Sequence, residues 1–212
     1  DRVMASASAK FKITDWLNVQ GRLSVDNTFD RFERKWHATT TATWAPGGNG
    51  RYRQERFDAK QFYGDLMLNF NKTWNASLGT SFQDNKVQNV ILDSDKLGLM
   101  EANFFVPENI NGNGNQRTSN PRKRLNSVFG TVQFGYNGMI YLDVTGRNDW
   151  SSALAFTDNF SYFYPSFGLT ALLNEMIPMT DKINLLKIRG SYSIVGNDVP
   201  AYITHPMDGI NL

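Results

Sequence analysis

The sequence contains no cysteine and only two histidines, His37 and His205. The absence of cysteine excludes disulfide frameworks, thiolate metal sites and cysteine nucleophiles. The two histidines lie far apart, each beside loop residues, so they give little basis for a catalytic pair. We therefore expect the protein not to be an enzyme, with no catalytic residues, no bound cofactor or metal, and no nucleic-acid partner.

Long hydrophobic runs are also missing, since none approaches the 18 residues that indicate a transmembrane helix. The first residues, Asp1 to Ala5, do not resemble a signal peptide, so the sequence is that of a cytosolic protein, a processed one or a fragment. The 212 residues are 41% hydrophobic and 13% aromatic with a net charge of +2. This composition excludes a highly charged disordered tail.

Apolar and polar residues alternate with period two along much of the chain, a pattern typical of β-strands. Eight strands are predicted, at residues 3–13, 17–26, 61–70, 74–83, 128–136, 140–146, 162–173 and 186–196. Several exceed the mean strand length of about 5–6 residues in globular proteins. The fold class is therefore all-β.

Three pairs of these strands are joined by connections of equal, three-residue length. For the third, a loop of Asn137, Gly138 and Met139 keeps apolar residues opposite one another, whereas a two-residue turn would set Val132 against Asp143. Gly138 supplies the left-handed conformation that such loops use. The predicted pairs are Tyr136 with Ile140, Phe134 with Leu142 and Val132 with Val144, and the other connections are Thr14–Trp16 and Asn71–Thr73.

The remaining connections are long: 29 residues at 30–58, 41 residues at 84–124, and a shorter one at 150–161. Short and long connections alternate along the chain. An antiparallel meander therefore places the tight turns at one end of the sheet and the long loops at the other, except that the longer 174–185 link lies at the end with the tight turns. Transmembrane β-barrels show this asymmetry, whereas loops of such length are uncommon in compact soluble domains.

The two faces of the predicted strands differ in chemistry. One face consists of Val, Leu, Ala, Ile and Phe, which suits hydrocarbon. The other carries charged and amide side chains that cannot fill a dry core cheaply, which favours a wet or plugged lumen: Arg22, Asp26, Asp65, Asn69, Gln133, Asp143, Arg147, Lys187 and Arg189. Aromatic residues gather at the strand ends, as in interfacial girdles. A β-sandwich with core aromatics is the alternative.

The stretch from Tyr141 to Ser152, YLDVTGRNDWSS, resembles a signature of the SusC/RagA family of TonB-dependent outer-membrane transporters. Two further blocks follow in the family's order, YFYPSFGL from Tyr162 and LKIRGSY from Leu186 with VGND from Val195. The resemblance covers roughly residues 125–200. It implies a 22-stranded barrel with an N-terminal plug, energised through TonB–ExbB–ExbD, closed outside by a SusD-like lipoprotein, and importing oligosaccharides or peptides in Bacteroidetes.

The chain shows no plug domain, no TonB box and no final aromatic strand, so residues 1–212 are interpreted as about eight strands of that larger barrel, in contact with outer-membrane lipid. The resemblance thus predicts nutrient uptake across the outer membrane, with glycan import as one form of it. Two alternatives stay open: a standalone small outer-membrane barrel with a structural or adhesion role, and a soluble carbohydrate-binding β-sandwich.

Binding chemistry is sparse. Asp93-Ser94-Asp95 is similar to the start of a calcium loop but lacks the required glycine and closing glutamate. Glycan binding needs aromatic platforms with convergent polar groups, and the predicted loops offer five aromatic candidates for substrate binding. These are Trp36, Trp44, Tyr52, Phe104 and Phe105. The alternative is that they pack against neighbouring loops, the lid protein or the membrane surface.

Overall fold

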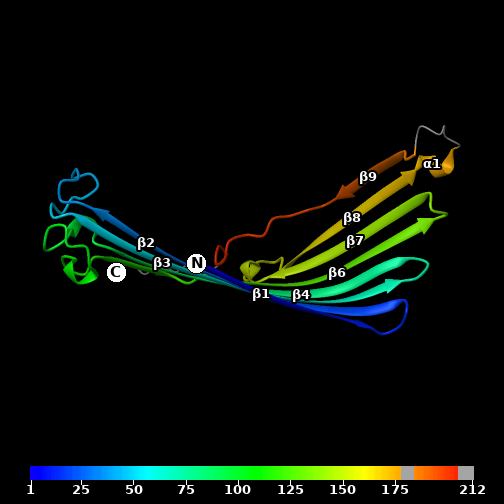
Figure 1. Cartoon of the computed structure of the whole chain (residues 1–212), viewed down its shortest axis with the longest axis horizontal. Coiled ribbons are helices and arrows are strands. Elements are labelled where there is room, and N and C mark those ends of the chain that lie inside the picture. Colours follow the sequence, from blue (N-terminus) through cyan, green and yellow to red (C-terminus); the bar gives the residue numbers. More distant parts are fainter. Residues whose placement is uncertain (178–183, 205–212) are drawn as a thin grey trace. The chain divides into compact units, whose positions relative to one another are not determined.

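The computed structural model describes residues 1–177 and 184–204. These residues form one antiparallel sheet of nine strands (Figure 1). Eight strands lie side by side in chain order: β1 (Arg2–Lys12), β2 (Leu17–Trp36), β3 (Arg51–Asn71), β4 (Asn75–Asp93), β6 (Arg122–Tyr136), β7 (Ile140–Ser151), β8 (Ser161–Leu172) and β9 (Lys187–Ser193). The ninth, β5 (Asn115–Ser119), pairs with β4 away from this path. The prediction of an all-β antiparallel fold is confirmed.

Among the described residues, helical structure is limited to single turns in the connections. These are η1 (Asp95–Leu97), η2 (Pro107–Asn109), η3 (Ser152–Leu154) and α1 (Leu173–Met176). Within the described ranges, none of these segments has the length and apolar character needed to cross a bilayer.

The central strands are much longer than predicted. β2 continues to Trp36 and β3 begins at Arg51, so the connection expected at 30–58 shrinks to residues 37–50. The prediction was wrong because charged residues occupy both faces of the strands here, as at Asp30, Arg31 and Glu33. The apolar–polar alternation that marks a strand is therefore lost from the sequence here. The strands still form, because backbone hydrogen bonding does not require that alternation.

The interval predicted as a 41-residue loop at 84–124 is also partly strand. It contains the second half of β4, all of β5 and the first residues of β6. β5 raises the strand number from eight to nine in the described residues. Its sequence, Asn-Gln-Arg-Thr-Ser, is polar on both faces and gives no apolar alternation, so only its pairing with β4 reveals it.

The predicted register of the β6–β7 hairpin is confirmed. Tyr136 lies opposite Ile140, and the same register places Phe134 opposite Leu142 and Val132 opposite Val144. Gly138 has φ of 70°, the left-handed conformation expected of it, and the preceding Asn137 has φ of 50°. The other two turns close near the predicted positions: the Ile13 N–H donates to the Leu17 carbonyl, and Lys72–Trp74 separate β3 from β4.

The chain divides into two compact units, which are described separately. The loop unit comprises Asp1–Ala5, Val25–Gln61 and Asn85–Arg122. The turn unit comprises Ser6–Ser24, Phe62–Asp84 and the chain from Lys123 onward. The small hydrophobic core of Tyr52, Leu99 and Ile110 lies in the loop unit.

In the turn unit, polar side chains on one face bind one another across the strands. The Asn69 amide donates to Asn18 Oδ1 at 3.1 Å and accepts a hydrogen bond from the Ser77 hydroxyl at 2.7 Å. Farther along the sheet, the Gln133 amide donates to Asp143 Oδ1 at 2.7 Å. Arg22 forms an ion pair with Asp65 at 2.7 Å. Arg22 and Asp65, and likewise Gln133 and Asp143, therefore share a face, as alternation predicts.

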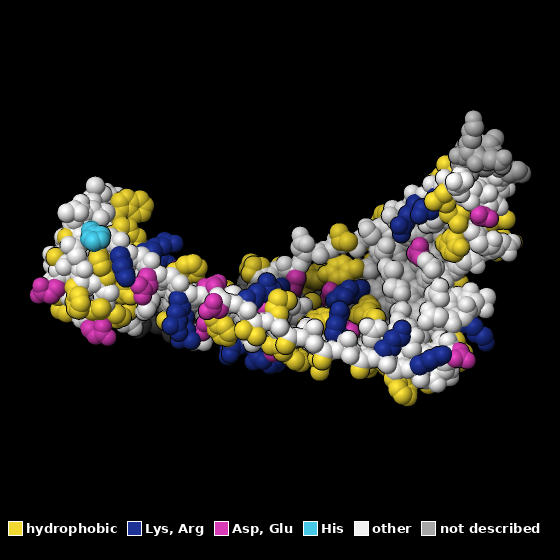
Figure 2. Space-filling view, viewed as in Figure 1, with side chains coloured by type: hydrophobic (Ala, Val, Ile, Leu, Met, Phe, Trp, Pro, Cys, Tyr) yellow, Lys and Arg dark blue, Asp and Glu magenta, His cyan; other side chains and the backbone are white. Residues whose placement is uncertain are grey.

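The opposite face of the turn unit is apolar and uncovered. Four aromatic rings form a continuous row at the tight turns, with centroids 6.1 to 6.4 Å apart, in the order Trp16, Phe70, Trp74 and Phe134. Farther along β3 and β4, Phe62 and Phe82 form a second aromatic contact at 6.2 Å. Between the two lie Leu66 and Leu78, which are 52% and 55% exposed. Figure 2 shows hydrophobic side chains lying at the surface among charged ones.

Candidate functional site

The five aromatic residues predicted to bind substrate all lie in the loop unit, where they separate into two groups. Tyr52 is only 2% exposed and belongs to the hydrophobic core, and Phe105 packs against that core. Trp36 lies half-buried, with the Arg51 guanidinium 5.0 Å above its ring. Trp44 and Phe104 are 60% and 57% exposed. Only these last two present broad aromatic surface to a ligand.

Tyr52 is fixed at both ends. Its backbone N–H donates to the Ser94 hydroxyl at 3.0 Å, and its own hydroxyl donates to Glu33 Oε1 at 3.2 Å. Burial raises the pKa of Tyr52, and the neighbouring Glu33 carboxylate raises it further. The phenol therefore stays neutral and acts as a structural anchor between β2, β3 and the loop after β4.

Arg51 makes several polar contacts in the loop unit. Its Nε–H and Nη2–H donate to the two carboxylate oxygens of Asp93 at 2.8 and 2.7 Å. A third group, Nη1–H, donates to the carbonyl of Trp44 at 3.4 Å. Such a two-point contact is both stronger and more directional than a single ion pair. Arg51 therefore fixes the end of β4 and the loop that carries Trp44.

Both carboxylate oxygens of Asp93 accept hydrogen bonds from the protein. Burial alone would raise the pKa of Asp93, but hydrogen bonds from Arg51 and from the Asp95 backbone N–H outweigh it and hold that pKa below its ordinary value. Ser94, the middle residue of the Asp93-Ser94-Asp95 motif, is fully buried and accepts from Tyr52. In the described part of the chain, no three His, Asp or Glu side chains lie together in a way that could hold a metal ion.

A polar cavity of about 240 Å³ opens beside this ion pair. The register of β4 with β5 sets Ile91 opposite Arg117 and Asp93 opposite Asn115. The cavity is lined by Arg51, Arg53, Ile91, Asp93, Asp95, Asn115 and Arg117. Its lining holds three guanidinium groups and two carboxylates, so it offers N–H donors to a carboxylate or carbonyl-rich ligand.

Two of these arginines have N–H groups without a hydrogen-bond acceptor among the described residues. The Nε–H of Arg53 is buried with no hydrogen-bond partner, although its Nη2–H donates to Glu55 at 3.0 Å. Arg117 donates from Nε to Asn115 Oδ1 at 3.2 Å, and among the described residues its terminal amino groups have no partner. Sequence reasoning missed these arginines because it placed residues 51–58 and 115–119 in loops. Once β3 is extended to Arg51, alternation alone puts Arg51, Arg53 and Glu55 on one face.

His37 is not among the residues that line this cavity. The His37 ring contacts the edge of Phe105 at 5.3 Å, and His205 lies outside the described residues. The loop unit thus offers exposed aromatic rings, an arginine-lined cavity and fixed hydrogen-bond donors.

The architecture is that of an all-β protein whose long antiparallel strands carry, in the turn unit, one apolar and one polar face. No protein-family model matches the chain, and no curated protein matches it. Solved structures of the RagAB peptide importer are similar: the open-open state at a TM-score of 0.72 and 18% identity, and the closed-closed state at 0.63 and 20%. A further structure of the RagAB peptide transporter aligns at 0.66 and 19%.

These alignments cover 91 to 94% of this chain but only 22 to 24% of the RagAB chains. The chain therefore spans about a quarter of the length of its structural neighbours. At this level of identity the likeness shows the fold, which is the fold expected from the SusC/RagA resemblance. The neighbours are transporters, one part of each being the SusC-like RagA.

Proposed function

We propose that this chain forms part of the wall and external loops of a TonB-dependent β-barrel transporter of the outer membrane. The observation that carries the proposal is the uncovered apolar face of the turn unit, bounded at both ends by aromatic contacts. On β3 this face runs from Phe62 to Phe70, which is nine residues and about 26 Å at 3.3 Å per residue. A transmembrane strand needs about 9–11 residues.

The charges along the strand agree with a membrane boundary at Phe62. The next residues on the same face of β3, beyond Phe62, are the charged Lys60 and Asp58. On β4 the next residue on this face beyond Phe82 is Asp84. Exposed apolar groups such as Leu66 are stabilised by hydrocarbon rather than water. The hydrogen-bonded polar face then belongs to a wet or plugged lumen, because its side chains already satisfy one another without a dry core.

The same features weigh against the two alternatives. A soluble β-sandwich buries its apolar face under a second sheet, whereas Leu66 and Leu78 are more than half exposed on the single sheet of the described residues. A standalone barrel must close on itself, and in the described residues β1 and β9 are the two end strands, with no pairing between them. Both alternatives therefore lose support.

The likeness to RagAB supports import as the activity and a SusD-like lipoprotein as the partner. Those neighbours are peptide importers, and oligosaccharide is the other substrate class that the SusC/RagA resemblance implies. In this proposal the plug and the TonB-contacting segment belong to other parts of a longer polypeptide. In this proposal the substrate contacts the exposed rings of Trp44 and Phe104 and the polar cavity beside Arg51 and Asp93.

The first test is the intact mass of the native polypeptide that carries this sequence, extracted from outer membranes with whatever co-purifies. We expect a chain about four times longer, accompanied by a lipoprotein. A 24 kDa species alone would overturn the proposal. Uptake of labelled peptides and of labelled oligosaccharides, with and without TonB, then identifies the substrate. Uptake that is unchanged without TonB would contradict active transport.

A further inference from the structure

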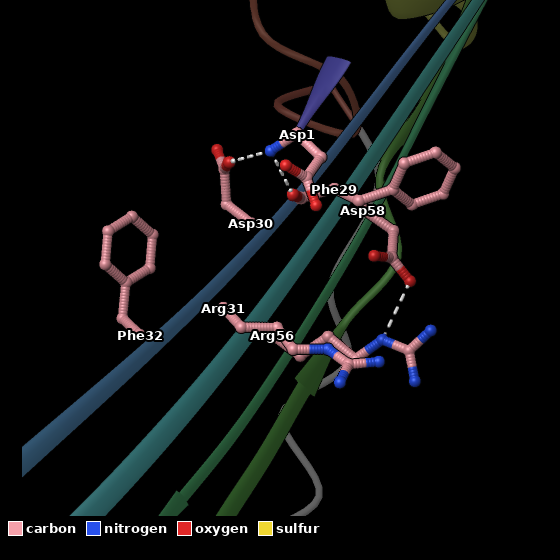
Figure 3. Close-up of a pocket in the computed structure, with 7 residues that line it drawn as sticks. All are labelled: Asp1, Phe29, Asp30, Arg31, Phe32, Arg56 and Asp58. Carbon is pink, nitrogen blue, oxygen red and sulfur yellow. Dashed lines mark hydrogen bonds and ion pairs between the residues drawn. The ribbon is translucent and has the colours of Figure 1, made fainter. Parts of the chain in front are cut away.

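Arg31 and Arg56 lie opposite each other on neighbouring strands of the loop unit. The contacts of Arg22 with Asp65 and of Trp36 with Arg51 both fit one register of the neighbouring strands β2 and β3. Five residues farther along each strand from the Trp36–Arg51 contact are Arg31 and Arg56. Both also line the same two cavities, and their side chains extend in the same direction in Figure 3.

Like charges directly opposite in a sheet are destabilising, and here they are only partly compensated. Arg56 donates from Nε to Asp58 Oδ2 at 3.1 Å. The Arg31 guanidinium has no hydrogen bond or ion pair within the part of the chain that the structure describes. Asp1, Asp30 and Asp58 line one of the two shared cavities, but of these only Asp58 forms a hydrogen bond with either guanidinium group.

The cavity over β2, β3 and β4 has the form of an anion site. It measures about 300 Å³ and is lined by Arg31, Gln54, Glu55, Arg56, Val90 and Leu92. The Glu55 carboxylate does not neutralise it, because Glu55 binds Arg53 and Asn89, which by strand alternation lie on the other face. The groups left to meet a ligand are the Arg31 and Arg56 guanidinium groups and the Gln54 amide. The apolar side chains of Val90 and Leu92 form the floor of the cavity.

We propose that Arg31 and Arg56 bind one phosphate-class oxyanion in this cavity. A tetrahedral phosphate offers oxygens to both guanidinium forks at once and cancels their mutual repulsion. The apolar floor of Val90 and Leu92 lowers the competition from water. Two sources carry this chemistry: the phosphate groups of lipopolysaccharide at the cell surface, and free phosphate. The proposal does not depend on transport, because binding is measured without it.

The test titrates inorganic phosphate into the full-length protein that carries this sequence, purified in detergent and phosphate-free buffer, by isothermal titration calorimetry. We expect saturable binding that weakens at least about tenfold in Arg31→Gln and in Arg56→Gln, since each removes a charge-assisted contact to the anion. Arg34→Gln is the matched control: it removes the same charge from β2, three residues away and on the other face. Arg31→Lys, which keeps the charge without the fork, should bind with intermediate strength.

A second arm uses lipopolysaccharide before and after enzymatic removal of its phosphate groups. Displacement of inorganic phosphate by the phosphorylated form alone identifies the surface lipid as the source, and failure of both forms to displace it identifies free phosphate. Either outcome supports the site, provided that the arginine variants reduce binding. Absence of saturable binding in both arms, or an equal loss in Arg34→Gln, overturns it.

Discussion

Arg51 holds both carboxylate oxygens of Asp93, at 2.8 and 2.7 Å, while its guanidinium lies over the Trp36 ring. The side chains are 18% and 8% exposed. Removing one member of such a shielded pair leaves the other charge without its partner, and we expect Arg51→Met to destabilise the loop unit by about 3 kcal/mol. Hydrogen exchange over residues 93–99 measures the loss. Lys96→Met, which alters an exposed lysine in the same loop, should have little effect, and the double variant Arg51→Met/Asp93→Leu should recover part of the stability.

The same pair predicts a dependence on pH. Because the pKa of Asp93 in the folded protein lies below its ordinary 3.8, the ionised carboxylate stabilises the loop unit above that value. The stabilisation is lost as the pH falls through the lower, folded-state pKa. In Arg51→Met, burial remains while the main compensating bond is gone, so the pKa should rise above 3.8. The Asp93 carboxyl ¹³C shift, followed across the acid range, measures both midpoints; equal midpoints would refute the assignment.

Membrane insertion of the apolar face is tested by charge. Leu66→Arg and Val144→Arg place a cation on the face proposed to contact lipid and should each cost about 2–4 kcal/mol near the middle of the bilayer. Thr145→Arg is the matched control, since Thr145 neighbours Val144 and, by alternation, faces the polar side. Outer-membrane assembly and refolding into vesicles report the difference. Normal assembly of both apolar-face variants would argue against lipid contact.

The β6–β7 turn depends on the left-handed backbone of Gly138, with φ of 70°. Gly138→Ala should destabilise the hairpin by about 1–2 kcal/mol, because a Cβ disfavours this conformation, and Gly138→Asn should cost less. Gly190→Ala is the control, since Gly190 lies in β9 with no atom within 4 Å of an added Cβ. Chemical denaturation in lipid vesicles compares them, and a similar loss in Gly138→Ala and Gly190→Ala would contradict the turn argument.

The exposed and buried loop aromatics should behave differently when truncated. Trp44→Ala and Phe104→Ala should weaken substrate binding while leaving stability nearly unchanged, because both rings are mostly exposed. Tyr52→Ala should instead cost about 3 kcal/mol or more of stability, since it empties the centre of the loop core. Binding titrations with peptides and oligosaccharides, paired with thermal unfolding, separate the effects. Unchanged affinity in both exposed-residue variants would remove them from the proposed site.

Sequence reasoning succeeded where structure depends on near neighbours along the chain. The alternation at residues 128–136 and 140–146, with one constrained turn between them, was enough to give the Tyr136–Ile140 register. Alternation also assigned Arg22 and Asp65 to one face, where they form an ion pair. A residue slip would have moved every apolar side chain to the wrong face, so the pattern permits a single register.

Strand prediction from the sequence failed where both faces of a strand carry charged residues. Residues 27–36 and 51–60 continue β2 and β3, yet no hydropathy signal marks them as strands. β5 is five polar residues, recognisable only from its ladder with β4. The five candidate aromatics looked alike in sequence, but folding buries Tyr52 and leaves Trp44 exposed.

The sequence alone therefore determined the strand class, the two faces and the tight hairpins, because each follows from a period of two and from turn chemistry within a few residues. Only the tertiary structure decided the loop core, the Arg51–Asp93 pair and the opposition of Arg31 to Arg56. Arg51 and Asp93 are 42 residues apart in the chain. Such partners are selected by the global register and by the closure of long loops, and no local pattern specifies either.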